Sequence, residues 1–310
     1  MHRESARKIL FFICLVLTTL PWIGPATALS IGVLFSLLLG NPWRQKISDY
    51  SKTLLQISVV GLGFGLSIGE VIDTGKTSIV ISVVGILFTL LVGYLLGRWF
   101  KTERNTSTLI SFGTAICGGS AIAAMAPVIK AKNDQTAVAL ATVFTLNAAA
   151  LLLFPTIGHL LQLDQATFGA WAGLAIHDTS SVVGAASAYG SQALAVGTTV
   201  KLTRAIWIMP FVLGAAWMTR SGQKFNFPYF ILGFVAASIV SSSVPQLSDM
   251  WETTAKIAKQ ALVVTLFLIG TGLSREVLRT VGIRPFLQGV SLWLMVGSLT
   301  LLVLTSVGLF

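Results

Sequence analysis

Charged side chains are scarce in this sequence of 310 residues: Asp, Glu, Lys and Arg together make up 10% of it, against about 25% in a typical soluble domain. Hydrophobic residues make up 54%. Because so few charges could not solvate the surface of a water-soluble protein, the composition excludes a soluble globular domain. It predicts an integral membrane protein.

Other expected signals are missing as well. The two cysteines, Cys14 and Cys117, give no disulfide framework, and three histidines cannot complete a metal site, so we predict no metal and no cofactor. No ATP-binding loop of the type G-x-x-x-x-G-K-[ST] occurs, so an ion or solute gradient must supply any energy. Ten-residue strands of alternating polarity are absent, which argues against a β-barrel.

The net charge of +10 would suit a nucleic-acid partner, but the basic residues stand at the ends of apolar runs. In that position they orient a membrane protein and meet anionic lipid headgroups. The predicted partners are therefore membrane lipids and a small solute, with no nucleic acid, and a homodimer is compatible with the sequence.

Apolar runs of about 15 to 27 residues follow one another, close to the roughly 20 residues that a helix needs to cross a bilayer. Their Gly, Ala and Ser content favours closely packed helices. We expect an all-α polytopic transmembrane helical bundle of about 9–11 segments, forming a single transporter domain (1–310) with repeat-like halves at roughly 26–158 and 165–310. The first helix, 8–24, is extra and resembles a signal peptide that is retained. The segments are 8–24, 26–40, 53–72, 77–97, 107–130, 134–158, 165–190, 193–218, 226–243, 256–273 and 285–310.

Two of these segments are interrupted, one by "CGGS" (117–120) and one by "HDTSS" (177–181). If every segment crossed once, Lys130 and Lys132 would lie outside, against the positive-inside rule. Two re-entrant hairpins that enter from opposite sides remove the conflict and put the N-terminus in the cytoplasm. Two interrupted helices that cross fully are the alternative. The basic residues that the hairpin topology places in the cytoplasm are Arg44, Lys46, Lys52, Arg98, Lys101, Arg104, Lys130, Lys132, Arg220, Lys224, Arg275, Arg279 and Arg284.

Internal echoes support this topology. "GFGLSIGEV" (63–71) is similar to "GTGLSREV" (270–277), and "CGGSAIAA" followed by "ATVFTLN" parallels "DTSSVVGA" followed by "GTTVKLTR". With two hairpins, each pair has opposite orientations, which is typical of an inverted-repeat transporter with its site near the middle of the membrane.

The first interruption predicts an anion site. Gly118 and Gly119 permit backbone conformations closed to other residues, and Ser120 is expected to cap a short helix that follows Cys117. The N-terminus of such a half-helix offers free N–H groups and a partial positive charge to an anion. A Gly-rich contact between helices is the alternative.

The second interruption combines neutral and titratable groups. Thr179, Ser180 and Ser181 are candidate solute ligands and cap residues, whereas His177 and Asp178 are candidates for coupling to H+ or Na+. An ionisable group at membrane depth is a functional-site hypothesis by default. An ion pair that only holds helices together is the alternative for Asp178.

Two cations, Lys201 and Arg204, lie three residues apart on one predicted helix face. Against the single carboxylate of Asp178 they leave a surplus positive charge, which favours an anionic solute. In the alternative interpretation, Arg204 extends to an interface and Lys201 pairs with Asp178. On the echo helix, Asn147 is a candidate to line the other side of the cavity.

The stretches "GTAICGGSAIAAMAPVIKAKNDQTAVALATVF" and "LAIHDTSSVVGAASAYG" resemble the signature stretches of the YeiH-type bacterial inner-membrane proteins, often labelled sulfate exporters. The resemblance covers nearly the whole chain. It implies about ten helices and a remote similarity to bile acid/sodium symporter-type carriers, with inverted repeats and discontinuous helices at the site. Residue by residue it implies a role for 117–120 and 177–181 only.

Together these observations predict a secondary-active transporter, an exporter of a small anion such as sulfate, a sulfonate or a carboxylate, that works by alternating access coupled to H+ or Na+. We expect it not to be an enzyme. The alternatives are an anion channel and an intramembrane hydrolase with Ser180 or Ser181 as nucleophile and His177 as base.

Overall fold

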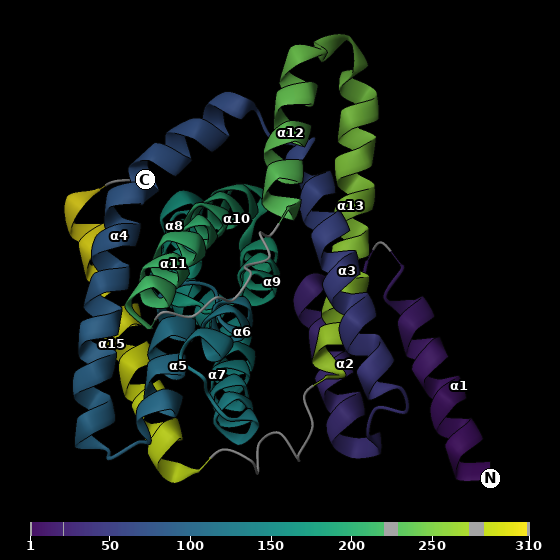
Figure 1. Cartoon of the computed structure of the whole chain (residues 1–310). Helices are drawn as coiled ribbons and strands as arrows, with labels where there is room; N and C mark the ends of the chain where they lie inside the picture. The colour runs from purple at the N-terminus through teal and green to yellow at the C-terminus, as the bar shows by residue number, and fades with distance from the viewer. Residues whose placement is uncertain (1, 21, 220–228, 273–281, 309–310) are drawn as a thin grey trace. The chain divides into compact units, whose positions relative to one another are not determined.

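The computed structural model describes residues 2–20, 22–219, 229–272 and 282–308. In these ranges the regular structure is helical throughout, and no strand occurs (Figure 1). Five helical stretches are long and apolar enough to cross a membrane, namely Ile68–Trp99, Asn133–Leu160, Ser191–Thr219, Pro245–Gly270 and Ile283–Val307. The prediction of an all-α polytopic membrane bundle is confirmed.

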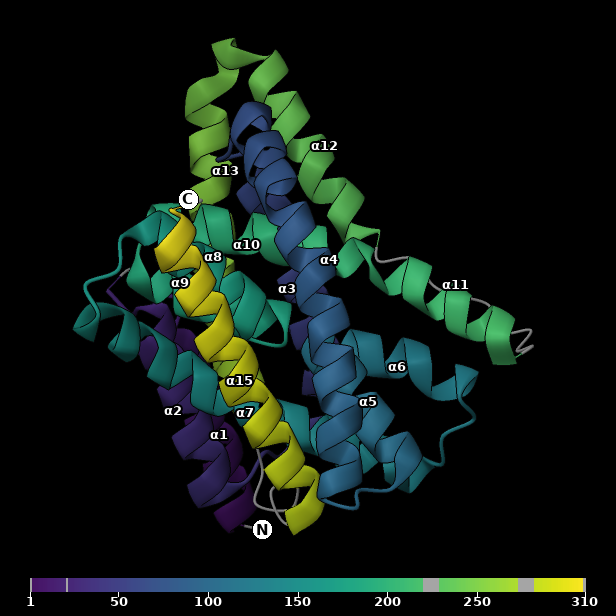
Figure 2. The same ribbon diagram turned by 90° about the vertical axis from the view of Figure 1, so that its left-hand side faces the viewer.

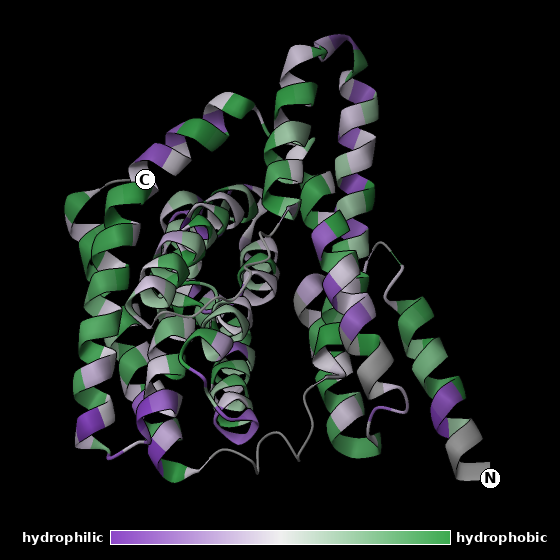
Figure 3. Cartoon of the chain, viewed as in Figure 1, coloured by the Kyte–Doolittle hydropathy of each residue, from purple (hydrophilic) through white to green (hydrophobic). Residues whose placement is uncertain are grey.

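The chain divides into two compact units, each built from two separate stretches: Met1–Ile72 with Pro228–Arg275, and Asp73–Phe227 with Glu276–Phe310. This division does not follow the repeat-like halves, which stay a prediction. The long span Ile68–Trp99 is mainly apolar between its ends, whereas hydrophilic residues also recur along the first-unit helices Arg44–Gly63 and Ser248–Gly270 (Figure 3).

The first unit contains the helices α1 (His2–Leu17), α2 (Pro25–Leu39), α3 (Arg44–Gly63), α12 (Phe230–Ser243), a short 3-10 turn (Pro245–Leu247) and α13 (Ser248–Gly270). Small residues let these helices approach closely. A Cβ added to Gly270 of α13 would lie 2.6 Å from the carbonyl oxygen of Leu29 in α2, and one added to Gly61 of α3 would lie 2.6 Å from the Cβ of Ala258 in α13. Such contacts are typical of helix packing in membranes.

The second unit contains most of α4 (Ile68–Trp99), and then α5 (Arg104–Ala115), α6 (Gly119–Val128), α7 (Asn133–Leu160), α8 (Gln165–Ala175), α9 (Thr179–Tyr189), α10 (Ser191–Ile206), α11 (Ile208–Thr219) and α15 (Ile283–Val307). Figure 2 shows the same elements from the side. α4 begins at a capping box, because the amide of Glu70 donates to the Ser67 hydroxyl and the amide of Ser67 donates to the Glu70 carboxylate, each at 3.2 Å.

The helices α5 and α6 form a re-entrant hairpin. Asn105, in the first turn of α5, donates to the side chain of Gln135 at 3.1 Å, and Gln135, in the first turn of α7, donates to Glu103. The chain therefore enters at residue 104 and is back at the same end when α7 begins. At about 1.5 Å per residue, these helices of 12 and 10 residues reach about half-way through a 30 Å hydrocarbon core.

The helices α8 and α9 form a second hairpin at the other end of α7. Asp164 begins α8 by accepting the amides of Ala166 and Thr167, both at 2.9 Å. At the return, the Tyr189 hydroxyl donates to the Leu163 carbonyl at 2.5 Å. The 28-residue helix α7 connects the open end of the first hairpin to the open end of the second. The two hairpins therefore enter from opposite ends of α7. Of the two topologies left open by the sequence, the described residues adopt the hairpins.

Several boundaries differ from the sequence prediction. The segment 53–72 is divided between α3 and α4, and the segment 193–218 is interrupted at Trp207, between α10 and α11. Pro210 explains the second break, because a proline in the first turn of α11 offers no N–H to the preceding turn. Arg220, Lys224, Arg275 and Arg279, and the end of the "GTGLSREV" echo, lie outside the described residues.

Candidate functional site

The tips of the two hairpins meet beside the middle of α7. At the first tip, Gly118 has φ +63° and ψ −123°, a conformation that favours glycine. A Cβ added there would lie 3.2 Å from the Cβ of Asp178 and 3.4 Å from the carbonyl carbon of His177. The structure thus brings together the two interruptions that the sequence singled out.

Asn147, at the middle of α7, joins this helix to the second tip. Its side-chain oxygen accepts the backbone N–H of His177 at 3.1 Å, and its side-chain nitrogen donates to the carboxylate of Asp178. The side chain is 2% exposed. Asn147 therefore holds the tip in place, and no free edge of its amide lines an open cavity.

Asp178 is the N-cap of α9. Besides the bond from Asn147, its carboxylate accepts the Ser181 amide at 2.6 Å, the Ser180 hydroxyl at 2.6 Å and the Ser181 hydroxyl at 3.0 Å. These four hydrogen bonds satisfy a carboxylate at membrane depth without a cation. The described residues hold no ion pair between Asp178 and Lys201.

The two cations of α10 bind the C-terminal ends of the other half-helices. Lys201 donates to the carbonyl of Ile116 at 3.2 Å, and Arg204 donates to the carbonyls of Ala115, at 2.6 Å, and Leu174. The last carbonyls of a helix lack partners within the helix and carry a partial negative charge. Lys201 and Arg204 are 0% and 1% exposed, so they lie behind the tips.

Several buried polar atoms near the tips have no hydrogen-bond partner within the described ranges. They include both ring nitrogens of His177, one terminal nitrogen of Arg204, and the hydroxyls of Thr114 and Thr198. The carbonyl of Val143 lies close to the His177 ring, but without the geometry of a hydrogen bond. Buried groups of this kind are uncommon and call for an explanation, such as a bound solute, an ion or water.

Exposure separates the predicted residues into two layers. Ser120 is exposed, and Gly119, Asp178, Thr179 and Ser180 are half-buried, so these five form the accessible layer. The buried layer, behind it, contains Cys117, Gly118, Asn147, His177, Ser181, Lys201 and Arg204. Gly118 of the buried layer lies against Asp178 of the accessible layer, so the two layers are in contact.

One predicted role is wrong in detail. Ser120 does not cap α6, because α6 begins at Gly119, after Gly118, and no side chain caps it. The sharp turn at Gly118 starts the helix two residues earlier than expected. The first amides of α6 therefore have no carboxylate acceptor, although the Cys117 sulfur lies close to the Ala121 amide and the Ser120 hydroxyl. The first amides of α9 have Asp178.

Sequence reasoning missed the backbone partners of the cations. Nothing in a pattern of side chains marks the carbonyls of Ala115, Ile116 and Leu174 as acceptors. Their position in the sequence could have identified these acceptors. Each lies just before an interruption, where a half-helix ends and its last carbonyls have no partner within the helix.

This arrangement defines the class of the protein: a polytopic helical membrane protein with two opposed re-entrant hairpins whose tips meet at membrane depth. The chain belongs to the family described as Conserved hypothetical protein 698, whose model matches residues 9–289, and this is the YeiH-type family that the sequence resembles. The similarity to bile acid/sodium symporter-type carriers stays a prediction.

The relatives are named as membrane proteins. A UPF0324 membrane protein of Geobacter sulfurreducens is 63% identical over 304 residues, covering 98% of each chain. One of Bdellovibrio bacteriovorus is 51% identical over 308 residues, covering 97% of this chain and 95% of its own. One of Vibrio vulnificus is 50% identical over 303 residues, covering 96% and 97%. No solved structure matches the chain.

Proposed function

We propose that this protein is a secondary-active carrier, an exporter of a small anion, which it binds at the accessible layer of the two tips. The observation that carries the proposal is the meeting of two half-helix N-termini beside the middle of α7, with Gly118 against Asp178. Paired half-helices that present their N-termini to a solute near the midplane are typical of transporters built from inverted repeats.

The uncapped start of α6 supports an anionic solute. The amides of Gly119 and Ser120 lack a side-chain acceptor, and the accessible hydroxyls of Ser120 and Thr179 lie at the same tips. An anion such as sulfate, a sulfonate or a carboxylate accepts hydrogen bonds from these groups. Lys201 and Arg204 attract it from behind, through their charge, without direct contact.

Asp178 and His177 are the proposed coupling groups. Protonation of Asp178 would weaken its acceptance of the Ser181 amide and so loosen the start of α9. In this way a proton could be linked to the geometry of the solute site. Sodium bound at the Asp178 carboxylate would compete for the same oxygens.

The charge distribution supports a bacterial inner membrane with a cytoplasmic N-terminus. In the second unit, the end at which the first hairpin enters carries Arg98, Lys101, Arg104, Lys130 and Lys132, whereas the opposite end carries Lys76 together with Asp73, His159 and Asp164. By the positive-inside rule the basic end faces the cytoplasm. In the first unit, Arg7 donates to the Leu39 carbonyl, so the start of α1 lies at the end where α2 finishes.

The hydrolase alternative receives no support from the side-chain geometry. Ser180 and Ser181 both donate to Asp178, and neither ring nitrogen of His177 has a hydrogen-bond partner among the described residues. The hydrolase alternative requires His177 as the base within hydrogen-bond reach of the serine, and the described residues do not make that contact.

The test is ligand-dependent stabilisation of the purified protein against sulfate, thiosulfate, sulfonates, dicarboxylates and chloride, at two pH values, with and without sodium. A ligand at about one hundred times its Kd stabilises the folded state by about 2.7 kcal/mol. We expect one anion class to raise the melting temperature, and Ser120→Ala and Thr179→Val to remove that shift. Ser187→Ala is the matched control, because this hydroxyl bonds only the Gly184 carbonyl of its own helix. If no anion stabilises the protein, the anion proposal is wrong.

A second assay separates a carrier from a channel. Proteoliposomes loaded with the stabilising anion should show saturable counterflow, because a carrier exchanges solute across its site. Conductance without counterflow would replace the carrier by a channel.

A further inference from the structure

A shallow pocket of about 390 Å³ lies in the second unit, where α4 ends and α5 and α15 begin. It stands at the base of the first hairpin. The 12 residues of α5, about 18 Å of helix, separate this pocket from the tips. The lining residues that matter are Lys101, Thr102, Glu103, Thr106, Gly282 and Arg284.

The charge of the pocket suits an anion. Lys101 and Arg284 are both exposed cations. The single lining carboxylate, Glu103, already accepts a hydrogen bond from Gln135. The lining residues therefore have an excess of positive charge, and an arginine and a lysine are the side chains that most often bind phosphate.

Two helix N-termini open on the pocket. α5 follows its N-cap Glu103 and α15 follows its N-cap Gly282, and neither helix receives a side-chain cap. The first amides of both helices are thus available to an acceptor. Their partial positive charges add to those of Lys101 and Arg284.

Two threonine hydroxyls give an independent sign of a missing ligand. Thr106 is 4% exposed, lines the pocket, and makes no hydrogen bond within the described ranges. The hydroxyl of Thr102 is also buried and without a partner there. A buried hydroxyl without a hydrogen bond, such as that of Thr102, costs free energy. A ligand that accepts from it and from the Thr106 hydroxyl would stabilise the fold.

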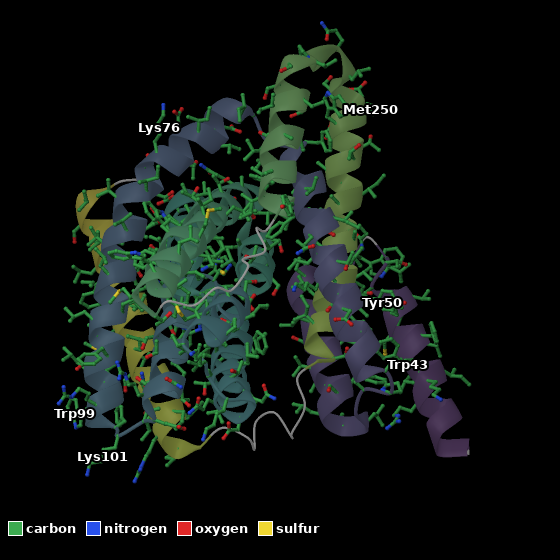
Figure 4. All side chains as sticks on the ribbon, viewed as in Figure 1. Trp43, Tyr50, Lys76, Trp99, Lys101 and Met250 are labelled. Atoms are coloured by element: carbon green, nitrogen blue, oxygen red, sulfur yellow. The ribbon has the colours of Figure 1, made fainter. Side chains whose placement is uncertain are left out.

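The position of the pocket indicates the membrane interface. Trp99, which ends the span of α4, is 79% exposed and stacks on Phe100. Exposed tryptophans at span ends lie at the level of the lipid headgroups. Figure 4 shows Trp99 and Lys101 at this same end of the second unit.

We propose that this pocket binds the phosphate of an anionic phospholipid headgroup. Lys101 and Arg284 pair with the phosphate, and the hydroxyls of Thr102 and Thr106 and the two helix N-termini donate to its oxygens. The acyl chains lie along the apolar part of α4. Free phosphate shares the chemistry of the headgroup but not the anchoring in the bilayer.

The bound lipid would hold three helices together. Four residues after Arg284, the side chain of Gln288 donates to the Gly93 carbonyl of α4 at 3.1 Å and to the Ser107 hydroxyl of α5 at 2.8 Å. α15 is thus already fastened to α4 and α5 one turn above the pocket. A headgroup that bridges Lys101, just after α4, and Arg284, in α15, would hold the same helices together at the membrane interface.

The test uses the full-length protein in a neutral detergent, titrated with short-chain phosphatidylglycerol, short-chain phosphatidylcholine and inorganic phosphate, with binding read by native mass spectrometry and by melting temperature. We expect saturable binding of phosphatidylglycerol, at least ten-fold tighter than that of the other two. Arg284→Gln and Lys101→Gln should each weaken it about five-fold, and Thr106→Val should weaken it further.

Arg98→Gln is the matched control, because this exposed arginine lies at the same end but bonds Tyr94 and does not line the pocket. Equal losses in Arg98→Gln and Arg284→Gln would mean unspecific attraction and overturn the proposal. Inorganic phosphate that binds as tightly as phosphatidylglycerol would replace the lipid by a soluble anion. The comparison of the three ligands on the unmodified protein decides the matter even where a variant does not fold.

Discussion

Asn147 is the side chain whose replacement tests the arrangement of the tips most directly. Asn147→Leu keeps a similar volume but removes the acceptor of the His177 amide and the donor to Asp178. If Asn147 holds the second tip, stability must fall. If it is a solute ligand only, as the sequence pattern allows, solute binding would fall and stability would not.

The size of the effect follows from the two lost hydrogen bonds. Side-chain hydrogen bonds in membrane proteins average about 0.6 kcal/mol in double-mutant cycles and reach about 1.7, and the carboxylate acceptor of Asp178 favours the upper value. The buried amide of His177, left without an acceptor, adds about 1–3 kcal/mol. We expect Asn147→Leu to lower the free energy of unfolding by about 3 kcal/mol.

The assay is reversible unfolding by SDS in detergent micelles, applied to Asn147→Leu, Asp178→Ala and the double variant. The cycle isolates the pair, and we expect a coupling energy of about 1.5 kcal/mol. Thr156→Val is the control, because its exposed hydroxyl bonds only the Leu152 carbonyl of the same helix. A coupling energy near zero, or an Asn147→Leu variant as stable as the control, would refute the reasoning.

Two further substitutions test the starts of the half-helices, by the same unfolding assay. Gly118→Ala should lower the free energy of unfolding by about 1–3 kcal/mol, because it forces a side chain into φ +63° and within 3.2 Å of the Cβ of Asp178. Gly85→Ala is the control, because a Cβ there meets nothing within 4 Å. Equal stability of the two variants would show that the tips do not touch. Burial by itself raises the pKa of Asp164, but hydrogen bonds from the first turn of α8, chiefly from Thr167, hold it below its ordinary value of 3.8. The unmodified protein should therefore exceed Asp164→Ala in free energy of unfolding by about 1 kcal/mol above pH 3.8, and this difference should disappear as the pH falls through the lower pKa of the folded state. A difference that does not depend on pH would contradict the role of Asp164 as a cap.

The hairpins could be predicted because two different kinds of evidence agreed. Local chemistry marked the interruptions, since glycines at 118–119 and polar residues at 177–181 cannot continue an apolar helix without cost. The basic loop at Lys130 and Lys132 then fixed the direction of the first hairpin, because positive charge is retained on one side of the membrane. Together they gave a topology that hydropathy alone could not give.

The boundary between α3 and α4 could not be found from hydropathy, because the apolar run continues through it. A finer signal was present in the sequence: Ser67 and Glu70 have the spacing of a capping box, and they form it. The contacts of the cations are different. Their acceptors are backbone carbonyls exposed only by the folding of α5 and α8, and no side-chain pattern encodes them.

The surplus positive charge of Lys201 and Arg204 over Asp178 has to be counted together with the partial charges of the helix ends. Each end of a half-helix carries about half a charge, and the tips hold two C-termini, of α5 and α8, and two N-termini, of α6 and α9. These contributions cancel. With Lys201 protonated, Lys201, Arg204 and Asp178 still leave one positive charge. Arg204 alone would balance Asp178, so the surplus depends on Lys201.

The location of that surplus decides what it can bind. The cations neutralise the C-termini of α5 and α8 in the buried layer, and Asp178 neutralises the N-terminus of α9. The N-terminus of α6 has no such partner among the side chains that the structure describes, and it faces the accessible layer. The positive potential is therefore available to a solute at Gly119 and Ser120. An anion bound there would interact with Lys201 across the start of α6, so Lys201→Met should weaken anion binding although the lysine never contacts the anion.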